Sequence, residues 1–340
     1  MDCGLPDDFT VNAAVALAVR APSVHNTQPW RWQIGDRTVH LYADPDRQLA
    51  ATDPDGRDLL LSCGAALHHL QVGFAALGWR ADVHRLPNPA DPNHLAAVEL
   101  HRHEPTQADI TLAAAIPRRR TDRRRHSSWP VPPADVELMA TRAADEGTIL
   151  RAADGSARYH LARAIQEAAR RHAGDPAYRI ELAAWSGRHA SVEGVPAFNA
   201  PAPDETPGAL PGRPFADPQL PQPPGAKGED DETVLLVLGT ASDDRMSQLR
   251  AGEATSAVLL TATSLGLASC PLTEPLEIAD TRDTVRDKVT GGTYPQMVLR
   301  IGWAPVNADP LPATPRRELH DVLQPLGSPE RPSHLRYQSH

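Results

Sequence analysis

This 340-residue chain has few cysteines and no long apolar run, and both features exclude classes of protein. It has only three cysteines, Cys3, Cys63 and Cys270, which lie too far apart for a disulfide framework or a CxxC metal site. No apolar run reaches the roughly eighteen residues of a membrane span, and the N-terminus is acidic where a signal peptide would be basic. The sequence therefore predicts a soluble, cytoplasmic protein with one large domain or two of ordinary size.

Lysine is nearly absent, since Lys227 and Lys288 are the only two, and arginine carries almost all of the positive charge. The net charge of -9 argues against a general nucleic-acid binder, which would need an excess of basic side chains. Genomic base composition also enriches arginine, so its abundance alone does not indicate a phosphate site.

The motifs of several common enzyme classes are missing. The chain has no GxGxxG or GxxxxGK[ST] stretch, which excludes the usual dinucleotide fingerprint and the P-loop. It also lacks a GxSxG elbow and an HExxH metal motif, although it contains 15 histidines. We therefore predict no metal site.

Apolar periodicity and capping residues predict the main elements. Helices are expected at 10–20, 58–77, 134–146, 156–172, 176–186 and 243–265, and strands at 30–34, 38–42, 98–100, 233–239 and 296–303. Prolines are dense between 188 and 232, so this segment is expected to be a linker or a loop laid over something. The chain after Leu326 is expected to be disordered.

Two of the predicted helices match each other in sequence. Residues 64–79 align without a gap on residues 252–267, and each copy ends in Leu-Gly followed by an apolar residue. A strand is expected after both copies. The match indicates an internal repeat, although two apolar helices that end in glycine could also match by chance.

The turn at residues 21–32 carries an unusual density of polar groups between two prolines. Pro22 and Pro29 fix the backbone, while Ser23, Asn26 and Gln28 offer hydrogen bonds that a planar heterocycle could use. The alternative is a capped turn whose polar groups satisfy only their own backbone.

Two arginine-rich stretches could bind an anion. One is Arg-Arg-Arg-Thr-Asp-Arg-Arg-Arg at 118–125, and the other is Thr-Pro-Arg-Arg at 314–317. Guanidinium groups so close together repel one another unless an anion or carboxylates lie among them. A solvated basic loop is the alternative for the first stretch.

Together these pieces resemble the nitroreductase superfamily of FMN proteins, and most closely its Acg-type branch. Residues 22–30, Pro-Ser-Val-His-Asn-Thr-Gln-Pro-Trp, are similar to the family's PSxxNxQPW turn, and the resemblance covers about residues 8–322. It implies that this turn touches the flavin through Pro22, Ser23, Val24, Asn26 and Gln28.

Other parts of the flavin site are implied in the same way. Residues 119–123 resemble the family's R-x-[ST]-x-[RK] motif, and residues 265–273 resemble its LGL-xxx-PI turn, whose backbone approaches flavin N5. Arg316 and Arg317 fall where relatives place phosphate-binding residues, although which of the two matches is open. The implied cofactor-binding residues are Arg119, Arg120, Thr121, Arg123, Pro271, Leu272, Thr273, Arg316 and Arg317.

The resemblance also implies an α+β, nitroreductase-like fold in which two tandem repeats form an intramolecular pseudo-dimer with mixed or antiparallel sheets. We expect one half at 8–105, a second half at 106–322 with a lid-like insertion at about 188–232, and a flexible tail at 323–340. The first half has the turn and the second half has the R-x-T-x-R motif, so we expect one complete pocket, one FMN per chain and a monomer in preference to a homodimer.

The activity implied is an oxidoreductase that transfers hydride from NAD(P)H through FMN to a nitroaromatic, a quinone or a similar small acceptor. No catalytic acid or base is predicted, because hydride transfer to flavin does not require one. Two departures affect turnover: Thr273-Glu274 replaces the glycine common in relatives, and the insertion is long. The alternatives are an FMN-sequestering protein whose lid covers the flavin, and an arginine-rich structural or regulatory protein without a cofactor.

Overall fold

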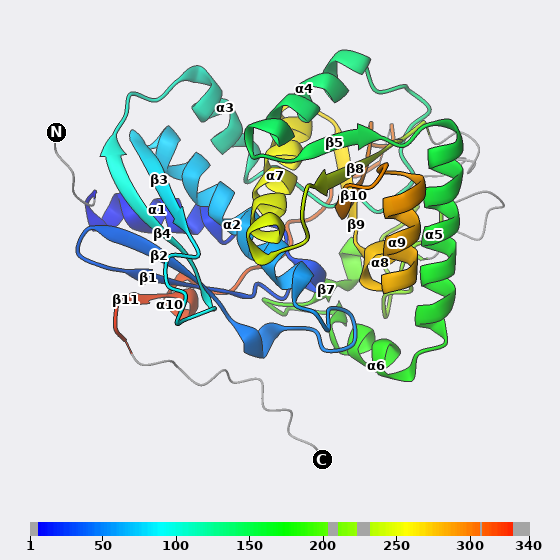
Figure 1. The fold of residues 1–340 in the computed structure, drawn as a ribbon, viewed down its shortest axis with the longest axis horizontal. Helices are drawn as coiled ribbons and strands as arrows, with labels where there is room; N and C mark the ends of the chain where they lie inside the picture. The colour runs from blue at the N-terminus through cyan, green and yellow to red at the C-terminus, as the bar shows by residue number, and fades with distance from the viewer. Residues whose placement is uncertain (1–5, 203–209, 223–231, 307, 329–340) are drawn as a thin grey trace.

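The computed structural model describes residues 6–202, 210–222, 232–306 and 308–328. Two lobes lie side by side, with the long helices α2 (Arg57–Ala76) and α7 (Arg245–Ser264) between them (Figure 1). The fold is the mixed α+β arrangement that the sequence predicted. Of the described helices, α2 alone is long and apolar enough to cross a membrane, but 83% of its apolar window is buried in the protein.

The first lobe is built on a five-stranded sheet in the order β11-β1-β2-β4-β3, in which β11 (Leu323–Pro325) is the last strand of the chain. Trp30 and Trp32 of β1 are fully buried in its core, as the alternation of a half-buried strand requires. The elements of this lobe are α1 (Asp8–Ala18), β1 (Trp30–Ile34), β2 (Thr38–Ala43), α2, β3 (Trp79–Arg85), β4 (His94–Arg102) and α3 (Gln107–Ala115).

The second lobe is built on a four-stranded antiparallel sheet in the order β5-β8-β10-β9. Its elements are α4 (Pro133–Asp145), β5 (Ile149–Ala152), α5 (Gly155–Ala173), α6 (Pro176–Ala184), β8 (Val234–Thr240), α7, β9 (Ala268–Leu272), α8 (Glu274–Glu277), α9 (Ala279–Lys288) and β10 (Tyr294–Gly302). A small separate pairing joins β6 (Ser186–Arg188) to β7 (Val195–Pro196).

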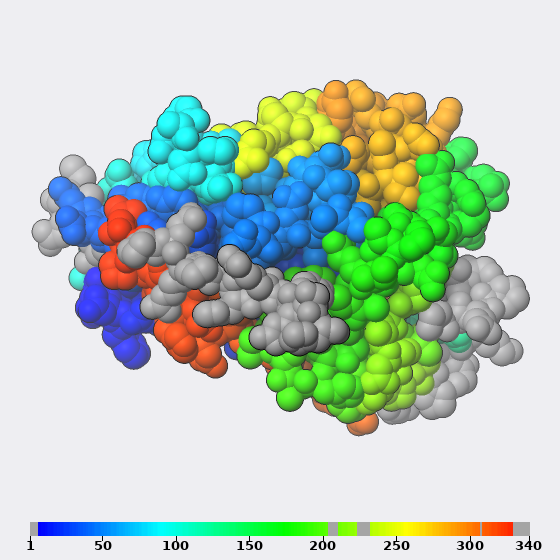
Figure 2. Space-filling view, turned by 90° about the horizontal axis from the view of Figure 1, so that it is seen from below, coloured from blue at the N-terminus to red at the C-terminus, as the bar shows by residue number. Residues whose placement is uncertain are grey.

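The last strand of the chain returns to the first lobe. After α10 (Leu319–Val322), β11 (Leu323–Pro325) pairs parallel with β1, with Trp32 opposite Leu323. Figure 2 shows these C-terminal residues, in red, against the blue residues of the first lobe. The prediction of a flexible tail from residue 323 is therefore wrong for its first three residues, because β1 offers them a free sheet edge; residues 329–340 lie outside the described chain.

The crossing of α2 and α7 is unusually close at two glycines. A Cβ atom on Gly64 would meet the carbonyl oxygen of Leu249 and lie 2.9 Å from the Cα of Gly252. A Cβ atom on Gly252 would in turn meet the carbonyl oxygen of Leu61 and lie 2.9 Å from the Cα of Gly64. The sequence repeat aligns Gly64 with Gly252, and the same offset extended by three residues aligns Leu61 with Leu249. Matching residues therefore make matching contacts. The division into two repeated halves stays a prediction.

The predicted elements are confirmed with shifts of a few residues at their ends. The sequence reading missed α3, β5 and the short elements α8, α9, α10, β6, β7 and β11, whose apolar patterns are too brief to stand out. The proline-rich segment has little regular structure in its described part, as expected: beyond β6 and β7 it contains the 3-10 turn Ala197–Asn199 and an isolated bridge between Pro201 and Leu220.

Candidate functional site

A cavity of about 220 Å³ lies between the two lobes. Its walls come from the 22–25 turn, α2, the 121–125 stretch, α5, α7, the β9–α8 connection and β10, together with the proline-rich segment. Ser23 and Thr121 both line it, so the turn and the R-x-T-x-R-like stretch meet at one site. Of the other predicted residues, the cavity is lined by Pro22, Val24, Arg123, Pro271, Leu272 and Thr273.

The 22–29 turn is sharply bent. Three of its non-glycine residues, His25, Asn26 and Gln28, have positive φ angles of 44°, 57° and 52°. The backbone amide of Gln28 donates to Ser23 Oγ at 3.0 Å, and that of Val24 donates to Ser62 Oγ of α2 at 3.2 Å. Such left-handed conformations persist only where neighbouring contacts hold them, and they are common at ligand-binding sites.

Asn26 and Gln28 hold the surroundings of the turn in place. Asn26 Nδ2 donates to the carbonyl oxygens of Gly194 at 3.1 Å and Pro315 at 3.3 Å. Gln28 Nε2 donates to the carbonyl of Val192 at 2.8 Å, and Gln28 Oε1 accepts from the amide of Arg317 at 2.9 Å. Neither side chain is part of the cavity wall, so these two predicted residues connect the turn to distant segments.

The 118–125 stretch is placed by the edge of the second sheet. Thr121 forms a parallel bridge to Ser269, and the amide of Asp122 donates to the carbonyl of Ser269 at 2.9 Å. This pairing brings Thr121 and Arg123 into the cavity. Asp122 also pairs with Arg124 at 2.9 Å, and both side chains are buried. The stretch is therefore a packed part of the fold, which rules out the solvated basic loop.

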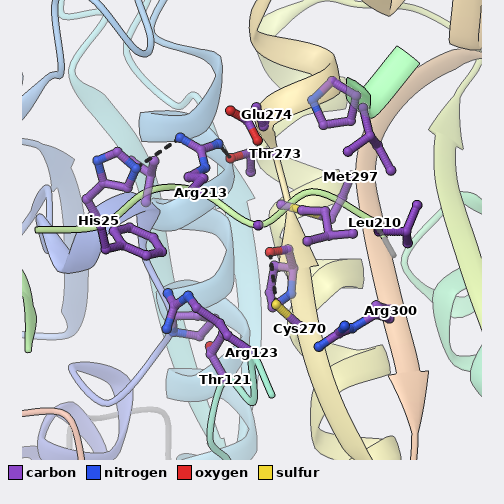
Figure 3. Close-up of a pocket in the computed structure, with 18 of the residues that line it drawn as sticks. His25, Thr121, Arg123, Leu210, Arg213, Cys270, Thr273, Glu274, Met297 and Arg300 are labelled. Carbon is purple, nitrogen blue, oxygen red and sulfur yellow. Dashed lines mark hydrogen bonds between the residues drawn. The ribbon is translucent and has the colours of Figure 1, made fainter. Parts of the chain in front are cut away.

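Arginines line the cavity at the end away from Thr273, where Figure 3 shows Arg123 and Arg300 on either side of Cys270. Arg123 donates to the carbonyl of Asn199 at 3.1 Å, and its guanidinium lies 4.8 Å from the centroid of the Phe215 ring. Arg158 of α5 donates to the carbonyl of Thr233 at 3.0 Å, and Arg300 of β10 donates to that of Arg124 at 2.7 Å. Arg125 belongs to the 118–125 stretch that the sequence indicated as a possible anion site, although it is not among the implied cofactor-binding residues. Sequence reasoning missed Arg158 and Arg300, because an arginine on a helix or strand usually faces solvent.

The other predicted arginines lie away from the cavity wall. Burial, followed by repulsion from Arg120, Arg123 and Arg20, lowers the pKa of Arg119 to about 10. Its Nε and Nη1 atoms are buried and have no hydrogen-bond partner among the described residues. Arg120 donates to the carbonyls of Pro117, Arg119 and Leu311.

Arg316 and Arg317 tie the C-terminal segment to the first lobe. Arg316 donates to the carbonyls of Val19, Arg20 and Ala21, which follow α1, at 3.0 to 3.1 Å. Burial, followed by repulsion from Arg119, lowers the pKa of Arg316 to about 9. Arg317 contacts Gln28 through its backbone amide. Both arginines therefore lie outside the cavity wall and hold residues 19–21 and Gln28, on either side of the 22–25 turn, in place.

The β9–α8 connection forms the opposite end of the cavity. Thr273 Oγ1 donates to Glu277 Oε1 at 2.6 Å, and Glu274 Oε1 lies 3.3 Å from His172 Nδ1. His172 in turn stacks on Tyr178, with ring centroids 3.8 Å apart. The Thr273-Glu274 pair that departs from the family pattern is therefore fixed in a buried network.

The proline-rich segment crosses the cavity, and Arg213 fixes it there. Arg213 Nη1 lies 3.0 Å from His25 Nε2 and 2.9 Å from Tyr178 Oη, and Arg213 Nη2 donates to Thr273 Oγ1 at 2.8 Å and pairs with Glu277. Figure 3 shows the guanidinium between His25 and Thr273. Burial, followed by repulsion from Arg213, lowers the pKa of His25 well below its usual range, so the imidazole is neutral. Arg213 therefore connects the turn, α6 and α8 across the cavity.

Three comparisons relate the chain to known proteins. No family model matches it. "Putative NAD(P)H nitroreductase Rv3131" from Mycobacterium tuberculosis (strain ATCC 25618 / H37Rv) is 56% identical over 325 residues, which cover 95% of this chain and 94% of that protein. "Putative NAD(P)H nitroreductase acg" from the same strain is 41% identical over 324 residues, covering 92% of this chain and 95% of that protein.

Solved structures give a weaker likeness. The FMN-dependent nitroreductase NfnB from Mycobacterium smegmatis, in complex with NADPH, has 17% identity and a TM-score of 0.38 over 62% of this chain and 96% of its own. A nitroreductase-named protein from Anabaena variabilis has 10% identity and a TM-score of 0.49 over 88% of this chain and 90% of its own. The extent and identity of the mycobacterial matches decide the assignment, and the chain belongs to the NAD(P)H nitroreductase family, in the group that includes acg.

Proposed function

We propose that the cavity binds one FMN and that the chain is a flavin-dependent oxidoreductase, which takes hydride from NAD(P)H and passes it to a small acceptor such as a quinone or a nitroaromatic. The observation that carries this proposal is the presence of Ser23 and Thr121 on the wall of one cavity. The names of the relatives support the same activity.

The chemistry of the walls fits FMN. Apolar side chains of Leu61, Ala65, Cys270 and Met297 line the cavity and would face a flat ring system. The cavity is also lined by four arginines that could bind a dianionic phosphate, Arg123, Arg125, Arg158 and Arg300. A ligand with an apolar ring and an anionic end matches a cavity that is lined partly by apolar side chains and partly by arginines.

Within this proposal the residues of the chain bind, orient and exclude water. Ser23, Thr121 and Arg123 would hold the ring edge and the polar chain of FMN, and Pro271, Leu272 and Thr273 would lie beside the reactive part of the ring. Bound FMN would supply the hydride-accepting centre, and the arginines would supply the positive field that favours the reduced anion. Arg119, Arg120, Arg316 and Arg317 would position the turn from outside the cavity.

A second candidate function is FMN sequestration. It is favoured by one observation, the covering position of the proline-rich segment, whose Phe215 and Arg213 line the cavity and are packed against His25. Hydride transfer needs the donor carbon about 3 to 3.5 Å from the flavin, so a segment held on that face would block the nicotinamide.

Anaerobic mixing of the flavin-loaded protein with NADPH or NADH separates the two functions. We expect the flavin absorbance to bleach within seconds because the proposed activity reduces it. Flavin that stays oxidised under excess NADPH and NADH would support sequestration. A preparation that is colourless and takes up no added FMN would contradict both functions.

The binding site itself is tested by Thr121→Ala. Loss of one hydrogen bond to the cofactor should raise the Kd for FMN about fivefold, measured by fluorescence titration. Thr141→Ala is the matched control, since the Thr141 hydroxyl bonds within α4 at the surface. Equal FMN affinity in both variants would remove Thr121 from the site.

A further inference from the structure

Among the residues that the structure describes, Asp58 is the one acidic residue that lines both the main cavity and a small neighbouring surface pocket. It lies in the first turn of α2, and the surface pocket also contains Asp53, Asp55 and Glu277. Asp55 is exposed, with a side chain 67% accessible. Asp58 therefore stands between bulk water on one side and the cavity on the other.

The carboxyl group of Asp58 is buried and incompletely bonded. The residue is 4% exposed, and its Oδ2 atom has no hydrogen-bond partner within the described part of the chain. The first amides of a helix would normally stabilise a nearby carboxylate, but here Asp53 Oδ2 accepts from the amide of Leu59 at 2.8 Å. Asp58 thus has little in its surroundings to stabilise a negative charge.

Burial and the nearby carboxylates together raise the pKa of Asp58 more than the nearby arginines lower it. Burial, followed by repulsion from Asp53 and Glu277, raises the pKa of Asp58 well above its usual range against the attraction of Arg57 and Arg213. Burial raises the pKa of the adjacent Asp53 to about 6, with the amides of Leu59 and Asp58 and the charge of Arg57 opposing it. Burial therefore favours the protonated form of Asp58. Asp53, which lines the surface pocket together with Asp58, is the neighbouring carboxyl group that could pass a proton to it.

The proposed reaction needs such an acid when the acceptor is reduced. Conversion of a quinone to a hydroquinone consumes one hydride, which originates from NAD(P)H, and one proton. Both C=O bonds become C–O single bonds, and two O–H bonds form, one with the hydrogen of the hydride and one with the proton. An open site could take this proton from water. Here the segment fixed by Arg213 crosses the cavity, and the carboxyl group of Asp58 on the wall is a proton donor inside it.

We propose that Asp58 donates this proton to the acceptor bound in the cavity and is reprotonated from solvent through Asp53 and the surface pocket. The inference rests on the proposed function. The step balances, because Asp58 loses one proton to the reduced acceptor and regains one from water, while NAD(P)H is oxidised to NAD(P)⁺.

Other polar groups of the cavity are less suited to the task. His25 is neutral and its Nε2 accepts from Arg213. Glu274 is bonded to His172, away from the surface pocket. Asp58 combines a free acid oxygen with a route to solvent.

The test measures re-oxidation of the flavin-loaded protein after chemical reduction with dithionite, so it does not depend on NAD(P)H. In stopped-flow mixing with a quinone, Asp58→Asn should slow re-oxidation about 100-fold, the size expected for loss of a general acid. Re-oxidation by ferricyanide, which takes electrons without a proton, should not change. Asp58→Glu should restore part of the quinone rate, and Asp287→Asn, an exposed position on α9, should behave as wild type.

A second readout uses the protein without cofactor. Infrared difference spectroscopy between wild type and Asp58→Asn at pH 7 should show the carbonyl band of one protonated carboxyl group. Absence of this band, or a quinone rate that is equal in Asp58→Asn and wild type, would overturn the proposal. If NAD(P)H fails to bleach the flavin while Asp58→Asn still slows the quinone step, the proposed function loses its electron donor and the role of Asp58 stands.

Discussion

The two sides of the α2–α7 crossing share one backbone arrangement and differ in their side chains: the open side contains the cavity, and the filled side contains a buried ion pair. On one side, α2 presents Ala65 to the cavity. On the other, the residue that the repeat aligns with Ala65 is Glu253 of α7, which is fully buried, pairs with Arg85 at 2.7 Å and accepts from Gln71 at 2.8 Å. A small residue leaves space for a ligand where its counterpart fills the space with an ion pair.

This difference explains why two matching helices need not produce two sites. The glycines at the crossing contact each other symmetrically, so the backbone would permit a cavity on either side. Side chains break the symmetry: the filled side adds Glu146 and His68, whose Oε1 and Nε2 atoms lie 3.9 Å apart. The open side adds the 22–25 turn and Thr121.

The largest expected effect on stability comes from removing the Glu253–Arg85 ion pair of the filled side. Glu253→Ala leaves Arg85, which is 14% exposed, without its carboxylate, and unpaired buried charges of this kind cost about 4 kcal/mol of unfolding free energy. Urea denaturation measures the loss. Arg80→Ala, which removes a pair exposed at the surface, is the control and should cost less than about 1 kcal/mol.

The double variant Glu253→Leu with Arg85→Met sharpens this prediction. It replaces the pair by apolar side chains and should recover most of the stability lost in Glu253→Ala. A single variant that costs no more than Arg80→Ala would show that the ion pair does not hold the filled side.

The crossing itself is tested by Gly64→Ala and Gly252→Ala. Each added Cβ meets the backbone of the other helix, so each variant should lose about 3 kcal/mol of unfolding free energy, and the two losses should be similar. Gly174→Ala is the control, because a Cβ there makes only ordinary contacts. Strongly unequal losses in the two variants would argue against a symmetric crossing.

Glu146 gives the filled side a pH dependence. Burial, followed by repulsion from Glu253, raises the pKa of Glu146 from 4.5 to about 7, against the attraction of Arg85 and Arg250. The protonated form is favoured in the folded state, so its contribution to stability is present below pH 4.5 and is lost as the pH rises through about 7. Glu146→Gln should therefore stabilise the protein by about 2 kcal/mol at pH 8 and have little effect at pH 4.

Thermal or urea unfolding of wild type and Glu146→Gln across this pH range measures the effect. A stability difference that does not grow between pH 4 and pH 8 would contradict the burial of Glu146 beside Glu253.

The smallest expected effect is on the open side. Arg213→Ala removes the contacts to His25, Tyr178, Thr273 and Glu277, so the segment should leave the cavity more often and flavin bleaching by NAD(P)H should become about tenfold faster. Arg179→Ala, exposed on α6, is the control. An unchanged bleaching rate in Arg213→Ala would show that the segment does not limit access.

The sequence revealed the parts of the site that have a local pattern. The proline-bounded turn, the arginine stretch and the matched helices are all visible in short segments, and they place Ser23, Thr121 and Thr273 on one cavity. Asn26 and Gln28 belong to the same pattern, but their direction depends on the 192–194 and 315–317 segments, which only the fold brings near.

The remaining residues could not be identified in this way. Arg213 and Phe215 lie in a proline-rich segment with no periodicity, and Arg158 and Arg300 look like ordinary surface arginines. Asp58 is a polar residue in the first turn of a helix, and its burial between two cavities is seen only in the folded chain. His25 was visible inside the turn, and its contact with Arg213 needs the folded chain.

The number of FMN molecules bound per chain tests the contrast between the open and the filled side most directly. Titration of the purified chain, followed by flavin absorbance against protein concentration, should saturate at one FMN per chain, and Thr121→Ala should weaken that site. Saturation at two equivalent sites per chain, or no uptake of FMN, would contradict the account.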